Sequence, residues 1–349
     1  MSFGSDFSVG LEEELMLVEA RAPHTLAPVS SAVLARMAAA PDIAGHEAYA
    51  AEIELRTPVC RSGAEAARAL AAGRRAVADA GATALVAGLH PVAAFGDAEL
   101  VDEPRYRRVR TDMRGLIERT PECALHVHVG MPDAGTAIRV LNGLRGWMPL
   151  LQALSANSPW WFGRDSGMAS ARWAMVRAYP GRGIPPVFPD YAAYEEAVDA
   201  ARAAGGFEDY THLWWDVRPH PRHGTVEVRE LDAQTSLDAV AGIAELIVAL
   251  ARRAAESPPR HQPSGEALAW SSFRAARDGL DAEVLDAAGQ VRPAAAVVAQ
   301  LIGELGRDGR LEPLERLLRE GGGAGLQRRA AEQGGAGGLV SDLVARTRP

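Results

Sequence analysis

The chain has 349 residues, of which 48% are hydrophobic and 23% charged, so it can form one large domain or two ordinary ones with a sizeable core. Its net charge of −8 argues against non-specific nucleic-acid binding, which needs clustered Lys and Arg. No stretch of 18 apolar residues and no leader-like segment is present, so we expect no membrane span and a cytoplasmic location. Cys60 and Cys123 are too few for a disulfide framework.

The first half of the chain alternates between strand-like and helix-like segments. Ser62 and Glu65 form a capping box, which predicts a helix that ends near Gly81. The stretch 96–115 is charged, and no element is predicted there. In chain order, the patterns predict strands at 7–18, 48–56, 83–88 and 124–130 and a short helix at 30–40.

The second half moves from mixed structure to helices. Asp133 is expected to cap a helix, and the Pro-, Gly- and Trp-rich stretch 157–190 is expected to be a functional loop that closes over a site. Further predicted elements are a helix at 190–205, two strands around a turn at 219–224, a helix at 235–257, and helices only from 264 onward, broken at the glycine clusters 321–325 and 334–338. We expect one catalytic domain over 1–349, with a sheet-containing core at about 1–257 and a helical part at about 258–349.

Four strand-like segments share one pattern, in which two polar side chains are spaced i, i+2 within an apolar run. These pairs are Glu12 and Glu14, Glu52 and Glu54, His126 and His128, and Glu227 and Arg229. Alternate residues of a strand point to the same face. If the four strands share a sheet, one face is crowded with carboxylates and two imidazoles, which is costly without counter-ions. The pattern therefore predicts a catalytic site for divalent metal.

Each pair by itself also has a simpler explanation. An HxH pair is commonly satisfied by hydrogen bonds or packing, and Glu227 with Arg229 could be a plain ion pair. Glu52 is expected to be solvated or to pair with Arg56. With hard oxygen ligands around the imidazoles, Mg²⁺ or Mn²⁺ is favoured over zinc.

Several longer segments carry a resemblance to a known family. They are, in order, VGLEEELMLVE, ELRTPVC, CALHVHVGMPD, LSANSPWWFGRDSGMASAR, WDVRP and TVEVRELDAQTSLDAVA, with weaker matches at FRAARDGLDAEV and GAGLQRR. The chain resembles the carboxylate-amine ligases of the glutamate–cysteine ligase type 2 family. That resemblance implies an α+β, glutamine-synthetase-like fold: a curved, mainly antiparallel sheet of about six strands with helices packed outside it.

The resemblance also implies an activity, an ATP-dependent condensation of a carboxylate with an amine through an acyl phosphate. The expected substrates are a small glutamate-like acid and an amine, and a homo-oligomer is possible. The implied metal ligands for Mg²⁺, or for Mn²⁺, are Glu12, Glu14, Glu54, Glu227 and His126. The implied nucleotide contacts are Arg229, Arg218, Arg172, Arg164 and Arg328, and the implied catalytic residues are Arg229, Glu54 and His128, the last as a candidate base.

The chain departs from the family pattern at a few positions. Ala124 replaces a glycine, Met168 and Ala171 replace two tyrosines, and Leu326 stands where an arginine is common. These changes leave the substrate open. Two other readings stay open from the residues: a metal-dependent hydrolase that uses the HxH pair and the carboxylates without ATP, and a non-catalytic ligand-binding relative.

Overall fold

The computed structural model describes residues 2–38, 42–259, 262–286 and 288–348, and it is built around one antiparallel sheet. The strand order is β2-β3-β1-β5-β9-β8, and β4 pairs with β1. Every strand pair in this sheet is antiparallel. The strands are β1 (Val9–Val18), β2 (Ala44–His46), β3 (Glu52–Arg56), β4 (Thr83–Leu85), β5 (Ala124–Gly130), β8 (Val217–His220) and β9 (Thr225–Asp232).

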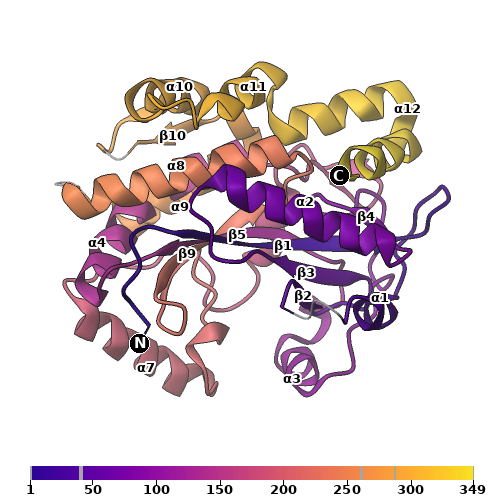
Figure 1. Cartoon of the computed structure of the whole chain (residues 1–349), viewed down its shortest axis with the longest axis horizontal. Helices are drawn as coiled ribbons and strands as arrows, with labels where there is room; N and C mark the ends of the chain where they lie inside the picture. Colours follow the sequence, from indigo (N-terminus) through magenta and orange to yellow (C-terminus); the bar gives the residue numbers. More distant parts are fainter. Residues whose placement is uncertain (1, 39–41, 260–261, 287, 349) are drawn as a thin grey trace.

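A layer of helices covers one face of the sheet (Figure 1). Apolar side chains on alternate strand positions, including Leu11, Leu15 and Val127, are buried in the main core of the protein. Burial of apolar surface on this face stabilises the fold by about 25 cal/mol per Å². The helices of this layer are α2 (Gly63–Asp79), α4 (Ala134–Arg145), α5 (Met148–Ser155) and α8 (Leu237–Glu256).

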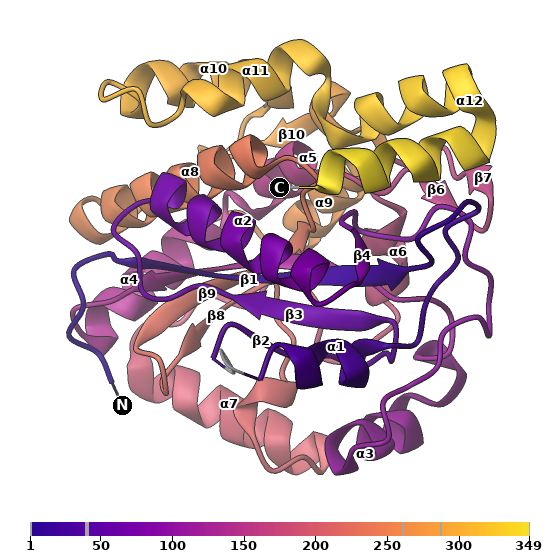
Figure 2. The ribbon, with the colours of Figure 1, turned by 45° about the vertical axis from the view of Figure 1, so that its right-hand side comes forward.

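The C-terminal part adds an outer layer beyond these helices (Figure 2). Its helices are α9 (Gly265–Asp278), α10 (Ala294–Leu305), α11 (Glu312–Glu320) and α12 (Gly322–Thr347), with a short 3₁₀ helix at Gly279–Asp281. The prediction of helices only was wrong here, because β10 (Glu283–Leu285) and β11 (Val291–Pro293) form a hairpin. Both glycine clusters lie largely within α12, which is kinked at Gly335 where φ is 63°.

Other elements lie on the opposite side of the sheet, where Figure 2 shows α1, α3 and α7. The charged stretch 96–115 contains α3, whose Tyr106 and Val109 pack into a small second core with Tyr49 and Tyr179. That amphipathic packing was not visible in its composition. The remaining elements are α1 (Ser30–Arg36), α3 (Pro104–Met113), α6 (Ala171–Val176), α7 (Tyr191–Gly205), β6 (Trp160–Trp161), β7 (Arg164–Asp165) and 3₁₀ helices at Arg114–Leu116 and Tyr210–His212.

The predicted α+β class with a mainly antiparallel sheet is confirmed, and β4 raises the strand number to seven among the described residues. The local signals also hold: Ser62 Oγ accepts a hydrogen bond from the Glu65 amide, and Asp133 Oδ1 accepts one from the Thr136 amide. In the described part of the chain, no helix has the length and apolarity to cross a bilayer. The division of one catalytic domain into core and helical part stays a prediction.

Candidate functional site: a carboxylate- and arginine-lined cavity

Strand register brings the four i, i+2 pairs onto one face of the sheet. Glu14 lies opposite Glu54 across β1 and β3, and Glu12 lies opposite His126 across β1 and β5. Across β5 and β9, His128 lies opposite Glu227. Because the intervening residues point to the helical layer, the polar residues face the other side of the sheet together.

This face forms the floor of a cavity of about 490 Å³. Its walls come from the loop after β2, from α3, from the segment around α6, and from the β8–β9 hairpin. The carboxylates that line it are Glu12, Glu14, Glu47, Glu52, Glu54, Glu122 and Glu227, and the arginines are Arg56, Arg105, Arg172, Arg182, Arg218, Arg222 and Arg229. Such a mixture suits a ligand that carries phosphate or carboxylate groups together with cations.

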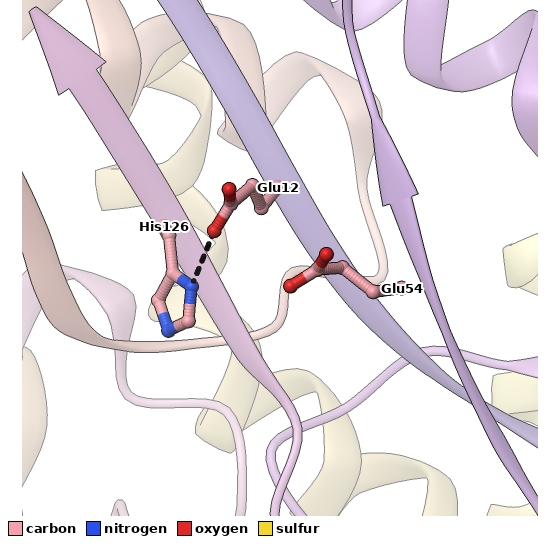
Figure 3. Close-up of side chains that lie close together, drawn as sticks. All are labelled: Glu12, Glu54 and His126. Atoms are coloured by element: carbon pink, nitrogen blue, oxygen red, sulfur yellow. Dashed lines mark hydrogen bonds and ion pairs between the residues drawn. The ribbon is translucent and has the colours of Figure 1, made fainter. Parts of the chain in front are cut away.

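Three sets of side chains on this face of the sheet have the arrangement of a metal site, and all of their members except His128 line the cavity. They are Glu12, Glu54 and His126; Glu12, His128 and Glu227; and Glu14, Glu47 and Glu54. Within each set, one candidate ligand atom from each residue lies within 4.8 Å of the others. Figure 3 shows the first set converging from three neighbouring strands, with His126 Nδ1 3.1 Å from Glu12 Oε2.

The chemistry of these donors fits a hard divalent cation. Carboxylate oxygens are the ligands that Mg²⁺ and Mn²⁺ favour, and one imidazole per site is compatible with them. The Nε2 atom of His128 is buried without a hydrogen bond in the described part of the chain, 3.5 Å from Glu12 and 3.8 Å from Glu227. A cation between these groups would satisfy all three.

Crowding of the buried carboxylates raises the pKa of some of them. Burial, with the charges of Glu14 and Glu54, raises the pKa of Glu47 to about 8. Burial and the charge of Glu12 raise the pKa of Glu54 to about 7, although Arg56 opposes the shift. Like charges held close together in a poorly solvated site disfavour ionisation, and a bound cation removes that penalty.

Other carboxylates are held ionised by nearby donors. Burial acts to raise the pKa of Glu227, but Arg218 and Arg229 outweigh it and hold this pKa well below its usual range. Burial likewise acts to raise the pKa of Glu12, but the hydrogen bond with His126 and the nearby imidazole of His128 prevail and lower it. The floor therefore combines carboxylates ready to bind a cation with guanidinium groups beside them.

The structure places the predicted arginines in two different regions. Arg172, Arg218 and Arg229 line the cavity, and Arg218 Nε donates to Glu227 Oε2 at 2.9 Å. Arg164 and Arg328 are not among its lining residues. Arg328 pairs with Asp165, at 2.9 Å, and also donates to the Met168 carbonyl, so a phosphate contact in this cavity has no geometric support for these two.

Among the residues of the cavity that sequence reasoning missed are Glu47, Glu52 and Arg182. Glu52 was expected to be solvated or paired with Arg56, and this was wrong: it is 1% exposed and accepts a hydrogen bond from Cys123 Sγ, while Arg56 binds Glu54. Strand alternation pointed Glu52 inward as clearly as Glu54. Glu47 and Arg182 lie in loops, where no periodicity reports the direction of a side chain.

The departures from the family pattern fall outside this cavity. Met168, Ala171 and Leu326 are not among its lining residues. Ala171 is fully buried and packs with Leu89 and Met175 at the start of α6. These substitutions therefore leave the metal-competent floor unchanged.

Solved structures share the fold of this chain. A glutamate–cysteine ligase from Francisella tularensis, in complex with AMP, superposes with a TM-score of 0.72 at 13% identity, covering 100% of this chain and 90% of the other. A bifunctional glutathione synthetase from Pasteurella multocida gives a TM-score of 0.66 at 16% identity, covering 98% of this chain and 51% of the other. At these identities the likeness concerns the fold alone.

Sequence comparison identifies the family. A putative glutamate–cysteine ligase from Rubrobacter xylanophilus is 36% identical over 366 residues, covering 99% of this chain and 96% of that protein. A glutamate–cysteine ligase from Haloferax volcanii is 34% identical, covering 97% and 96%. The model of glutamate-cysteine ligase family 2 matches residues 8–345. The chain therefore belongs to glutamate–cysteine ligase family 2 and is an ATP-dependent carboxylate-amine ligase.

Proposed function

We propose that this enzyme joins a carboxylate of glutamate, or of a similar amino acid, to an amine, and that the cavity on the polar face of the sheet is its active site. The observation that carries this proposal is the convergence of Glu12, Glu14, Glu54 and Glu227 with Arg229 in one cavity. A carboxylate is a poor electrophile, and amide formation in water is uphill. Transfer of the terminal phosphoryl group of ATP to the carboxylate, giving an acyl phosphate, solves both problems.

The proposed metal ligands are the carboxylates of the floor with His126, and Glu47 completes one set with Glu14 and Glu54. Bound Mg²⁺ or Mn²⁺ would neutralise phosphate charge and let an acidic protein hold a polyanion. The AMP bound to the Francisella ligase supports an adenine nucleotide as ligand in this fold.

The arginines of the cavity have separate proposed roles. Arg229 is held through Nη1 by its ion pair with Glu227, and its guanidinium would contact the phosphoryl group that is transferred. Arg218 is held by Glu227 and by the Leu213 carbonyl at 2.7 Å, which makes it a rigid part of the same wall. Preorganised charges of this kind stabilise the transition state without reorganising during the reaction.

Water must be kept from an acyl phosphate, because hydrolysis would waste it. The stretch 157–190 was predicted to be a lid, and in the structure it supplies Arg172, Tyr179 and Arg182 to the cavity wall. His128 stays the proposed base for the amine, and in this role its Nε2 is not a metal ligand, so that the cations belong to the sets that contain His126 and Glu47. Its Nδ1 lies 3.0 Å from Thr225 Oγ1, which fixes the orientation of the ring.

The test is phosphate release coupled to product formation. The purified enzyme is incubated with ATP, Mg²⁺, L-glutamate and a panel of amines and amino acids, cysteine included, and products are identified by mass spectrometry. A ligase releases phosphate only when ATP, metal, acid and amine are all present. Turnover that ignores ATP, or no condensation with any pair, would contradict the proposal. The cytoplasmic location and a homo-oligomeric state stay predictions.

A further inference from the structure

The C-terminal motif GAGLQRR, at 323–329, packs on a segment that leads to one of the cavity's arginines. These residues form the start of α12, in the outer layer of helices (Figure 2), and they are not among the residues that line the cavity. The Ala324 amide donates to the Ala156 carbonyl at 3.1 Å. From Ala156 the chain runs through the β6–β7 hairpin to Arg172, which does line the cavity. The motif therefore contacts the active-site wall from outside.

Gln327 is a buried polar residue of this motif, with 1% of its surface exposed. Its Nε2 donates to the carbonyl and to the Oδ1 atom of Asn157, at 2.7 and 2.9 Å. Asn157 is also held from its other side, because its Nδ2 donates to the Ala233 carbonyl at 2.8 Å. The helix backbone packs just as closely, since a Cβ atom at Gly323 would lie 2.3 Å from Asn157 Oδ1. The start of α12 and Asn157 therefore fix each other's position.

Asp232 extends this contact toward the cavity. It is fully buried at the end of β9, and its Oδ2 accepts a hydrogen bond from the Asn157 amide at 2.8 Å. The same oxygen accepts the Ser158 hydroxyl at 2.7 Å, and Oδ1 accepts the Ser170 hydroxyl at 2.9 Å. Burial raises the pKa of Asp232, and Arg172 together with these three donors opposes that shift. One carboxylate thus joins both ends of the β6–β7 segment.

The two serines also hold the start of α6, where Arg172 enters the cavity wall. Ser158 Oγ accepts a hydrogen bond from the Arg172 amide at 3.2 Å, and Ser170 Oγ accepts the hydrogen bond that caps the helix. The Arg172 guanidinium donates through Nη1 to the Glu230 carbonyl at 3.3 Å and lies 3.7 Å from Asp232 Oδ1. The backbone and the side chain of Arg172 are therefore both placed relative to Asp232.

We propose that Gln327, although it lies outside the cavity, is a positioning residue of the active site: through Asn157 and Asp232 it holds Arg172 in the cavity wall. The inference rests on the proposed function, which makes this cavity the active site. A packed interior transmits a displacement because it is hardly compressible. A shift of about 1 Å at a positioned group can lower a rate about 100-fold, so a remote contact of this kind controls turnover.

Two variants disturb the contact in different ways. Gln327→Met removes the donor at nearly the same size, and Gly323→Ala displaces Asn157 from the helix backbone without removing a polar group. Gly337→Ala is the matched control, because it is the same substitution on the same helix and its Cβ atom would meet nothing within 4 Å. Circular dichroism spectra establish that each variant is folded, and Gly323→Ala keeps the comparison decisive should Gln327→Met not fold.

Steady-state kinetics of ATP-dependent phosphate release test whether the contact acts through Arg172. We expect Gln327→Met and Gly323→Ala each to lower kcat/KM at least about tenfold, and Gly337→Ala to stay within about twofold of the wild-type enzyme. Arg172→Met should lower kcat/KM at least as much. In the Arg172→Met background the changes at 323 and 327 should cost less than about twofold more, because the group that they position is already gone. A general structural defect would instead lower both backgrounds by the same factor.

Hydrogen–deuterium exchange followed by mass spectrometry tests the same contact without turnover. Gln327→Met and Gly323→Ala should speed exchange in peptides that cover 156–176, and Gly337→Ala should leave it unchanged.

The inference is overturned if the folded variants at 323 and 327 keep wild-type kcat/KM, if their losses multiply with that of Arg172→Met, or if exchange over 156–176 does not respond to them. A wild-type enzyme that releases no phosphate with any acid and amine, but whose exchange over 156–176 responds to Gln327→Met, would refute the ligase reaction and leave the contact from α12 to Arg172 standing.

Discussion

Arg74 on α2 donates two hydrogen bonds to Glu13 on β1, from Nε to Oε2 at 2.8 Å and from Nη2 to Oε1 at 2.6 Å. Both side chains are almost fully buried. Glu13 stands between Glu12 and Glu14, on the opposite face of the strand. The pair therefore fixes from behind the strand that carries two proposed metal ligands, and Arg74 also donates to the Thr235 carbonyl at 2.9 Å.

Breaking this pair should destabilise the whole fold. Arg74→Met leaves the Glu13 charge buried without its partner, and we expect the free energy of unfolding to fall by about 3–5 kcal/mol. Urea unfolding followed by circular dichroism measures the change. The neighbouring Arg75 is exposed, so Arg75→Met should stay within about 0.5 kcal/mol of the wild-type protein. Equal losses in both variants would contradict the assignment.

Removing one carboxylate of the floor should stop turnover and keep the fold. Glu54 belongs to two of the three metal-competent sets, so Glu54→Gln should lower ATP-dependent phosphate release by about 100-fold or more. Titration with Mn²⁺, followed by electron paramagnetic resonance, should show weaker binding. Glu266→Gln, an exposed change on α9, is the matched control. Wild-type-like phosphate release by Glu54→Gln would remove Glu54 from the site.

Glu47 gives an independent test of the set of Glu14, Glu47 and Glu54, because it was found only from the structure. Glu47→Gln removes one of three clustered carboxylates, so we expect weaker Mn²⁺ binding and a loss of phosphate release of at least about tenfold. An unchanged Mn²⁺ affinity would mean that the set of Glu14, Glu47 and Glu54 does not hold the metal.

The shape of the Arg229 side chain should matter as well as its charge. Arg229→Lys keeps a cation but loses the planar fork, and we expect the rate constant of turnover to fall about 100-fold with a smaller change in the KM of ATP. Steady-state kinetics with varied ATP separate the two effects. Arg202→Lys, on the exposed surface of α7, should behave like the wild-type enzyme. A change in KM alone would assign Arg229 to nucleotide binding and not to the phosphoryl transfer.

Asp216 should make stability depend on pH. Burial and the nearby Glu230 carboxylate raise the pKa of Asp216 to about 8 in the folded protein, against an ordinary value of about 4. As pH rises, the unfolded chain loses this proton first. Stability of the wild-type protein relative to Asp216→Asn should therefore be full below about pH 4, fall as pH rises to about 8, and then level off.

Urea unfolding of both proteins at about pH 5, 7 and 9 measures this difference. Because the variant cannot ionise at position 216, the comparison cancels the titration of groups that do not interact with Asp216, and the coupled Glu230 is counted with it. A difference in unfolding free energy that is constant across this range would show that Asp216 keeps an ordinary pKa in the folded state.

The amino-acid sequence by itself determined most strands of the main sheet and much of the floor. Period-two alternation states which side chains share a face, so the pairs at Glu12 and Glu14, His126 and His128, and Glu227 and Arg229 could be read without coordinates. Capping residues such as Ser62 and Asp133 also marked where helices start. They could be recognised because their hydrogen bonds span only a few residues along the chain.

Only the tertiary structure decided which strands are neighbours and what the loops contribute. Antiparallel register set Glu14 opposite Glu54 and His128 opposite Glu227, and this depends on pairing between segments far apart in the chain. Glu47 and Arg182 come from loops, whose backbone follows no repeating period, so their direction is set by the packing around them. Motifs alone also could not show that Arg164 and Arg328 lie outside the cavity. A sequence pattern determines the direction of a side chain within its own element, whereas the distance between elements is set by how the layers pack.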